Sequence, residues 1–143
     1  MTTALYTASA TSWGGRTGKV VTSDDKLSLD LSIPAEMGGD GGAGTNPEQL
    51  FASGWAACFH SAVKAVSRAH KVDVSDSAVT LYVNVIGGVA AGFDFEVTID
   101  VQIPGADPAA AKALVDQAHE VCPYSRATKG NVPVTLNIIT DED

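Results

Sequence analysis

The sequence predicts an α+β fold in which antiparallel β-sheets surround one long buried helix. The stretch from Thr45 to His70 is apolar nearly all round over its middle part, which is typical of a helix buried on most sides. Alternating apolar and polar residues before and after this stretch indicate strands. The chain of 143 residues, 45% of them hydrophobic, suits a single domain over residues 1–143 that buries its own core.

Short strands are predicted in the amino-terminal part. Residues 5–10 and 19–22 have strand character and flank a glycine-rich turn that holds Arg16. Residues 27–33 alternate between apolar and polar side chains, and Pro34 ends that strand. The glycine-rich residues 37–44 then form a flexible or sharply folded connection to the long helix.

The long helix has a well-marked start. Asn46 suits the N-cap position, Pro47 suits the first helical position because no amide hydrogen is needed there, and Gln49 has capping-box spacing. Small residues around Gly54 let another backbone approach the middle of the helix. We expect a second helix, from this chain or from a partner, to pack there.

The remainder of the chain is predicted to form a hairpin, a helix and a last strand. Residues 78–87 and 93–103 are strands joined by glycines. Apolar side chains recur at helical spacing over residues 108–120. The Cys-Pro-Tyr-Ser segment at residues 122–125 interrupts this helix, and residues 132–139 close the chain as a strand.

Charge and composition limit the partners. Nine Lys and Arg residues against seventeen Asp and Glu residues give a net charge of −8, which disfavours nucleic acid and anionic membrane as partners. The sequence has no signal-like amino-terminal region and no apolar run of about 18 residues, so we expect a cytoplasmic protein. In such a protein its two cysteines indicate buried packing or redox chemistry rather than a structural disulfide.

Residues 39–44 match the G-x-G-x-x-G pattern of dinucleotide-binding folds. We interpret the match as accidental. Several residues beginning with Pro34 separate it from the preceding strand, and Glu48 would place negative charge near the phosphates. The flanking strands also look antiparallel, and no carboxylate follows about 20 residues later at a strand end.

Metal binding and Cys-His hydrolysis have little support. Cys58 and His60 are two residues apart on a helix and therefore lie on different faces. The sequence contains no C-x-x-C or H-x-x-x-H pair. A hydrolase would need His60, His70 or His119 beside Cys58, together with a group that orients the histidine. Nothing in the spacing promotes that arrangement.

Cys58 allows two interpretations. Free cysteine is among the most buried residue types, so Cys58 is either a small core residue or a reactive thiol. A thiol in apolar surroundings has a raised pKa and is inert unless a cation lies near it. Arg16 is a candidate for that cation, and the alternative is a solvated charge in a loop. The residues by themselves leave both questions open.

Two segments carry a specific pattern: PEQLFASGWAACF at residues 47–59 and VCPYS at residues 121–125. Both resemble the organic hydroperoxide resistance (Ohr) branch of the Ohr/OsmC peroxidase family. GGRTG at residues 14–18 and MGG at residues 37–39 extend the match over essentially the whole chain. The resemblance implies an OsmC-like fold in an intertwined cytoplasmic homodimer that reduces organic hydroperoxides.

The resemblance also implies roles for four residues. Cys58 would be the peroxidatic cysteine and Cys122 the resolving cysteine, while Arg16 and Glu48 would form the polar pair that activates the thiol. No cofactor or metal is implied, and a lipoylated protein or another external dithiol, such as a dihydrolipoyl group, would recycle the enzyme. The alternatives are an OsmC-branch peroxidase with broader peroxide use, a cysteine-based redox sensor, and a structural protein with inert thiols.

Helix geometry adds an expectation about assembly. Glu48 and Cys58 are ten residues apart on one helix, so roughly 15 Å along the axis and about 80° around it separate them. Glu48 therefore cannot reach Cys58 of its own chain directly. We expect a homodimer in which Glu48 comes from a second copy of the helix. In the one-chain alternative, Arg16 spans the gap.

Overall fold

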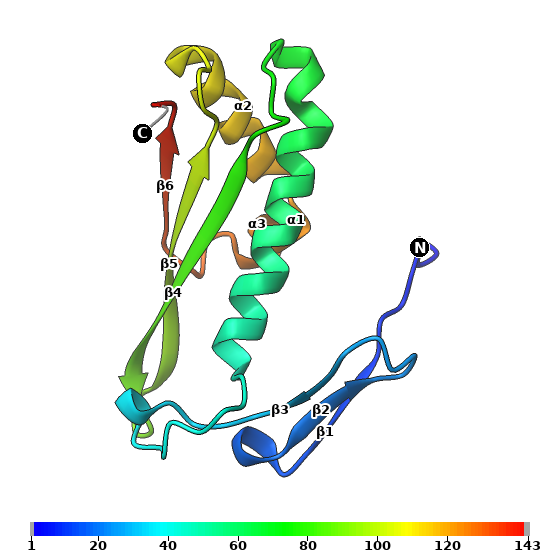
Figure 1. Ribbon diagram of the computed structural model, residues 1–143, viewed down its shortest axis with the longest axis vertical. Helices are drawn as coiled ribbons and strands as arrows, with labels where there is room; N and C mark the ends of the chain where they lie inside the picture. The colour runs from blue at the N-terminus through cyan, green and yellow to red at the C-terminus, as the bar shows by residue number, and fades with distance from the viewer. Residues whose placement is uncertain (1, 142–143) are drawn as a thin grey trace. The chain divides into compact units, whose positions relative to one another are not determined.

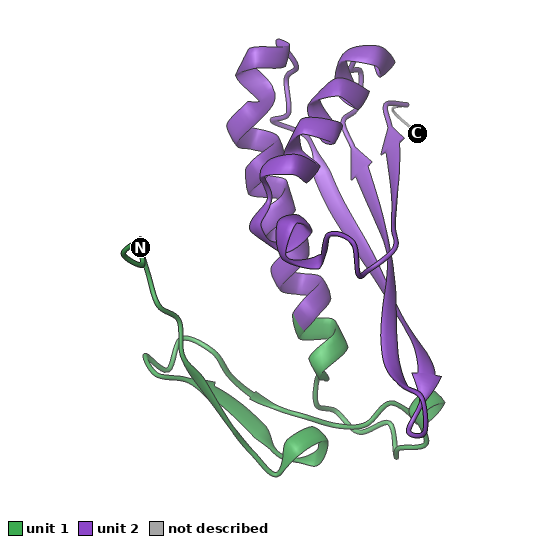
Figure 2. Cartoon of the chain, turned by 180° about the vertical axis from the view of Figure 1, so that it is seen from behind, with its two compact units in different colours: residues 1–50 green, residues 51–143 purple. Residues whose placement is uncertain are grey.

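The computed structural model describes residues 2–141. The chain divides into two compact units, residues 1–50 and 51–143, which Figure 2 distinguishes by colour. The long helix α1 (Pro47–His70) starts at the end of the first unit and runs through the second. The expectation that residues 1–143 form a single domain stays a prediction.

The first unit contains a small antiparallel sheet and two single-turn 3-10 helices. These elements are β1 (Ala10–Trp13), η1 (Gly15–Thr17), β2 (Lys19–Thr22), β3 (Ser28–Asp30) and η2 (Ala35–Met37). The strand order is β1-β2-β3. The turn between β1 and β2 depends on Gly14, whose φ of 76° places it in the left-handed region that glycine adopts readily.

Two strand predictions for this unit differ from the structure. The first strand was expected at residues 5–10, but β1 covers residues 10–13 because Ala10 pairs with Thr22 and Trp13 pairs with Lys19. The strand expected at residues 27–33 is shortened to β3. Leu31 instead forms an isolated parallel bridge with Thr45. In both cases the pairing partner, rather than the local pattern, sets the ends.

The start of α1 is confirmed. The side chain of Asn46 accepts a hydrogen bond from the backbone N–H of Gln49 at 2.8 Å, which satisfies one of the otherwise unpaired amides of the first turn. The Gln49 side chain accepts a second bond from the Thr45 hydroxyl at 2.7 Å. Pro47 occupies the first helical position as expected.

The second unit packs α1 and two further helices against a three-stranded sheet (Figure 1). Its elements after α1 are β4 (Ala78–Gly88), β5 (Gly92–Gln102), α2 (Pro108–Val121), α3 (Pro123–Thr128) and β6 (Val134–Ile139). The β4–β5 hairpin and α2 are as predicted. Asp107 caps α2 by accepting a bond from the amide of Ala110 at 3.0 Å.

The direction of β6 corrects the expectation that the sheets are purely antiparallel. β6 pairs with β5 in parallel, with Val97 opposite Val134 and Gln102 opposite Ile139. Parallel neighbours need a crossover connection rather than a tight turn, and α2 and α3 supply it. The crossover contains the Cys-Pro-Tyr-Ser segment and thereby brings it against the helix layer.

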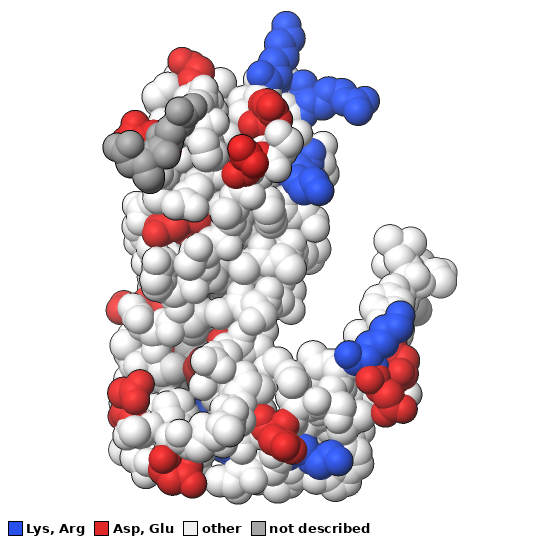
Figure 3. Space-filling view, in the orientation of Figure 1, with Lys and Arg blue, Asp and Glu red and all other residues white. Residues whose placement is uncertain are grey.

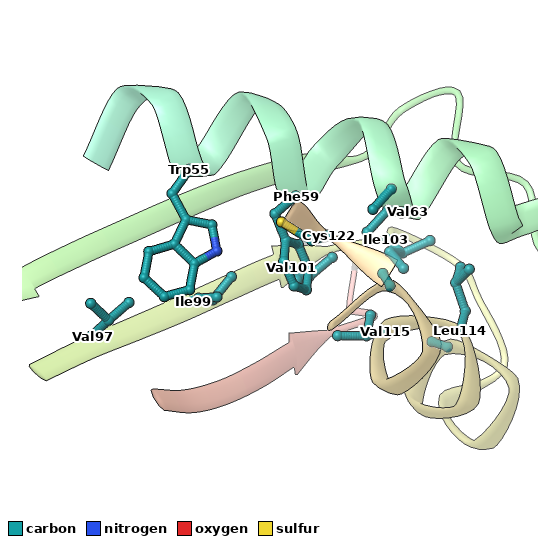
Figure 4. Close-up of a cluster of buried hydrophobic side chains, with 13 residues drawn as sticks. Trp55, Phe59, Val63, Val97, Ile99, Val101, Ile103, Leu114, Val115 and Cys122 are labelled. Carbon is teal, nitrogen blue, oxygen red and sulfur yellow. The ribbon is translucent and has the colours of Figure 1, made fainter. Parts of the chain in front are cut away.

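The core lies between α1, the sheet and α2. Trp55, Phe59 and Val63 from α1 meet alternating side chains of β5 and one face of α2 (Figure 4). The fully buried members from β5 and α2 include Ile99, Val101, Leu114 and Val115. Because side chains on one face of a strand recur every second residue, residues 97, 99 and 101 of β5 all point into this core.

Only one face of α1 is buried within the chain, so the expectation of burial on most sides is not met by a single copy. Ser53, Ala57 and Ser61, four residues apart along the helix, are exposed. The small residue Gly54 does receive a neighbour, which is Tyr124 of α3. The second helix expected to pack there therefore comes from this chain.

The charged residues of α1 lie near its two ends. Figure 3 shows basic side chains at the carboxy-terminal end of α1, where Lys64, Arg68 and Lys71 are exposed. Between this end and Glu48, the helix carries no charged residue. Of the helices in the described part of the chain, none combines the length and hydrophobicity that a bilayer span requires.

Candidate functional site

Cys58 lies in the middle of α1, at the edge of the buried core. Its side chain is half-buried and packs against the core cluster. The neighbouring residue Phe59 points fully into the core, whereas Ala57 is exposed. The thiol thus sits at the boundary between the packed face of the helix and its open face.

Cys122 lies at the junction of α2 and α3 and is fully buried. It ends α2, where its amide donates to the carbonyl of Ala118 at 2.9 Å, and it precedes α3, where Pro123 occupies the first position. Its extended backbone, with φ −63° and ψ 125°, breaks the helix between the two. In Figure 4 its sulfur lies beside Phe59, on the side of the core that faces α1.

The fold brings the two cysteines together. Cys58 and Cys122 are 4 Å apart, and both are free thiols. They are 64 positions apart in the sequence (122 − 58), so it is the α2–α3 crossover that makes them neighbours. These are the two cysteines to which the resemblance assigns the peroxidatic and resolving roles, and those roles stay predictions.

The surroundings of Cys58 in this unit disfavour its thiolate. Burial raises the pKa of the Cys58 thiol, and the adjacent Cys122 raises it further by its charge and by accepting a hydrogen bond. One contact acts in the opposite direction. The backbone amide of Tyr124 is hydrogen-bonded to Cys58 and lowers the pKa of its thiol, because the amide stabilises the negative sulfur.

Arg16 and Glu48 form a two-pronged ion pair in the first unit. Arg16 Nη1 donates to Glu48 Oε2 at 2.8 Å, and Nη2 donates to Oε1 at 2.6 Å. The Glu48 side chain is 12% exposed and that of Arg16 is 39% exposed. Hydrogen bonding to Arg16 holds the pKa of the Glu48 carboxyl below its usual value, and bonding to Glu48 raises the pKa of Arg16.

Each partner of this pair is fixed by a distinct local structure. Arg16 is the central residue of η1, and Glu48 lies in the first turn of α1, where a carboxylate is also favoured by the helix dipole. One face of the guanidinium fork is thereby oriented by Glu48. The pairing agrees with the expectation from the resemblance, and its action on Cys58 stays a prediction.

The histidines have other neighbours. His60 is hydrogen-bonded to Ser77 at 2.9 Å, and His70 is bonded to Gln117 at 2.6 Å. His119 packs against Phe59, and burial lowers its pKa. Over residues 2–141 no group of three His, Cys, Asp or Glu side chains is arranged to hold a metal ion. The glycine-rich residues 39–44 form a loop that follows η2 rather than a strand, so they lack the strand that precedes the motif in dinucleotide-binding folds.

Contacts of the Cys-Pro-Tyr-Ser segment with α1 were not foreseen from the sequence. Trp55 Nε1 donates to Ser125 Oγ at 3.3 Å, with both residues buried. The Tyr124 ring stacks on Trp55, with ring centroids 6.2 Å apart and an interplanar angle of 20°. The sequence places Tyr124 and Ser125 close to Cys122, which was the available signal for these contacts. Their partner Trp55 is some 70 residues away, so the sequence did not identify it.

Comparison with known proteins gives consistent results. The family model of OsmC-like proteins matches residues 38–137. The chain is 52% identical over 139 residues to an organic hydroperoxide resistance protein of Xanthomonas axonopodis pv. citri, covering 94% of each chain. It is 44% identical to the organic hydroperoxide resistance protein OhrA of Bacillus subtilis, covering 96% of this chain and 99% of that one.

Solved structures show the same likeness. A crystal structure of an organic hydroperoxide resistance protein from Legionella pneumophila superposes with a TM-score of 0.89 at 47% identity, covering 96% of this chain and 99% of that one. One from Elizabethkingia anophelis superposes with a TM-score of 0.90 at 38% identity, covering 98% of this chain and 100% of that one.

Proposed function

The chain belongs to the OsmC-like family, and we propose that it is a thiol-dependent peroxidase that reduces organic hydroperoxides to alcohols. The observation that carries the proposal is the pair of free thiols 4 Å apart at the edge of the core. Relatives at 52% and 44% identity are named organic hydroperoxide resistance proteins. Resistance to such compounds is accounted for by an enzyme that removes them.

The two thiols can run a complete reaction cycle. The Cys58 thiolate attacks the terminal oxygen of the hydroperoxide, the O–O bond breaks, and the alkoxide leaves and takes up a proton to become the alcohol. Cys58 is left as a sulfenic acid. The Cys122 thiol then condenses with it, which releases water and forms a disulfide. An external dithiol reduces this disulfide by two electrons and restores both thiols.

The first step requires a group that offsets the raised pKa of Cys58. Burial and Cys122 both disfavour its thiolate, so at neutral pH the surroundings supplied by residues 51–143 leave it mostly protonated. A guanidinium beside the sulfur would lower the pKa by charge and hydrogen bonding and would stabilise the leaving alkoxide. Arg16, already oriented by Glu48, is the group that we assign to this task.

The site is proposed to be completed in a homodimer. Cys58 and Glu48 are separated by roughly 15 Å along α1, so the Arg16–Glu48 pair of one copy would serve Cys58 of the other. The exposed strip of Ser53, Ala57 and Ser61 supports this assembly, since small residues let two helices approach closely. Gly54 is already covered by Tyr124 of its own chain, so the strip rather than Gly54 would form the contact.

The apolar surroundings of Cys58 favour organic hydroperoxides over hydrogen peroxide as substrates. Phe51, Tyr124 and Cys58 all pack as partly buried side chains against the core, which offers an alkyl or aryl group an apolar surface next to the sulfur. We propose the cytoplasm as the compartment, because its thiol pools keep such cysteines reduced. The external reductant is proposed to be a dithiol such as a dihydrolipoyl group.

A peroxidase assay tests the proposal. Purified protein with dihydrolipoamide should consume many equivalents of cumene hydroperoxide and should turn over hydrogen peroxide more slowly. A redox sensor would instead consume about one equivalent and stop. A protein with inert thiols would show no selective oxidation of Cys58 by mass spectrometry. Either result would refute the enzymatic function.

A further inference from the structure

Gly54 and Tyr124 fit together at the cysteine pair. Gly54 lies four residues before Cys58 and therefore on the same side of α1. A Cβ atom built on Gly54 would lie 2.5 Å from Tyr124 Oη and 3.1 Å from Tyr124 Cζ. Glycine thus leaves the space that the tyrosine ring occupies, and any larger residue would displace the ring.

The ring has little freedom to move elsewhere. It is stacked on Trp55, which is fully buried. Phe51 meets it edge-on, with centroids 6.2 Å apart and an interplanar angle of 67°, and Phe51 is in turn packed on Phe95 at 5.0 Å. Close-packed aromatic neighbours of this kind resist displacement, so a clash at Gly54 would be transmitted to the backbone of Tyr124.

That backbone carries both of the contacts that matter to Cys58. Cys122, only two residues before Tyr124, lies 4 Å from Cys58, and the interaction of the Tyr124 backbone amide with Cys58 lowers the pKa of that thiol. Pro123 between them restricts the backbone, so the ring, the amide and the second thiol belong to one stiff segment. A shift of the ring therefore moves the amide and the Cys122 thiol together.

We propose that the Tyr124 ring, seated over Gly54, positions the Tyr124 amide on the Cys58 sulfur and keeps Cys122 within reach of it. Gly54 and Tyr124 are positioning residues for the reaction, acting through the backbone rather than on the substrate. The inference rests on the proposed function in taking Cys58 as the nucleophile. Withdrawing the amide removes a contact that favours the thiolate, so the pKa of Cys58 rises.

The first test uses Gly54→Ala, which adds only the methyl group that would clash. Alkylation of Cys58 by iodoacetamide, followed by peptide mass spectrometry across a pH series, should show the midpoint raised by about one pH unit, or about tenfold slower alkylation below the midpoint. Closure of the Cys58–Cys122 disulfide is measured with diamide, which takes two electrons and two protons from the thiols. It should be about tenfold slower than in the unaltered protein.

A second variant separates displacement of the ring from general damage to the helix. Tyr124→Phe removes the Oη atom that lies nearest to the added methyl group and keeps the ring. By itself it should leave both readouts unchanged, and combined with Gly54→Ala it should restore at least half of the loss. Gly88→Ala, where an added Cβ meets no atom within 4 Å, is the matched control and should behave as the unaltered protein.

The outcomes are decisive in both directions. An unchanged midpoint and closure rate in Gly54→Ala would overturn the inference, and so would a double variant that recovers nothing. Both readouts work without peroxide. If the unaltered protein failed to consume hydroperoxide while the variants behaved as described, the proposed function would fall and the positioning role of Tyr124 would stand.

Discussion

The hydrogen bond between Trp55 and Ser125 allows a stability effect to be worked out from the structure. Replacing Ser125 by Ala leaves the indole N–H of the fully buried Trp55 without its acceptor. We expect the free energy of unfolding to fall by about 1–3 kcal/mol, which is the usual penalty for a buried donor left unpaired. The bond length of 3.3 Å is long for an N–H···O bond, so the desolvated donor contributes most of this loss.

Urea unfolding at one fixed protein concentration, followed by circular dichroism, measures the effect. The midpoint should fall without a change in the m-value. Ser28→Ala, at an exposed position of β3, is the control and should change the stability by less than about 0.5 kcal/mol.

A Trp55→Phe background tests the cause. It has no indole N–H, so Ser125→Ala should destabilise the protein less there than in the unaltered protein. The reasoning would be refuted if Ser125→Ala lost less than about 0.5 kcal/mol, or if it lost the same amount in both backgrounds.

Three further predictions concern the thiols and the ion pair. Cys58→Ser should abolish peroxide reduction, because an alcohol is not ionised at neutral pH. In Cys122→Ser, hydroperoxide should still oxidise Cys58, and the sulfenic acid should accumulate. Mass spectrometry after one equivalent of hydroperoxide checks both variants. Arg16→Lys keeps the charge but cannot make both bonds to Glu48. We expect about a tenfold loss of kcat/KM, the equivalent of one charge-assisted hydrogen bond at a partly exposed site. An activity equal to that of the unaltered protein would contradict the role of Arg16 in activating the thiol. A mixed dimer of Glu48→Ala and Cys58→Ser chains should recover activity, because a two-chain site leaves one complete copy, and an inactive mixture would show instead that the site lies within one chain.

The features that the sequence predicted well are those set by local interactions. The N-cap at Asn46 and the proline after it mark the start of α1 within one turn, and the structure has the cap bond at 2.8 Å. The β4–β5 hairpin and α2 follow from alternation and from helical spacing. The close approach of Arg16 and Glu48 came from the resemblance and not from spacing, because 32 residues separate them.

The features that were missed depend on distant partners. β1 begins at Ala10 because its register with β2 fixes it, and the residues before it give no sign of that. The parallel direction of β6 is set by the crossover through α2 and α3. A second helix was expected at Gly54, but the sequence did not indicate that this helix is α3 or that the ring of Tyr124, 70 positions further on, fills the space over Gly54. No local pattern specifies such a match of shape.

The placement of the two cysteines also bears on the entropy of the unfolded chain. A bond between Cys58 and Cys122 would close a loop of roughly 65 residues that contains both strands of the hairpin and all of α2. Closing a loop of this length lowers the conformational freedom of the unfolded chain by the equivalent of roughly 4 kcal/mol. Folding and disulfide formation are linked in one thermodynamic cycle. The free energy by which the disulfide stabilises the folded state therefore equals the free energy by which folding favours the disulfide over the two thiols. The protein with the disulfide is therefore more resistant to unfolding than the protein with two free thiols. A reductant that opens the bond removes this added stability.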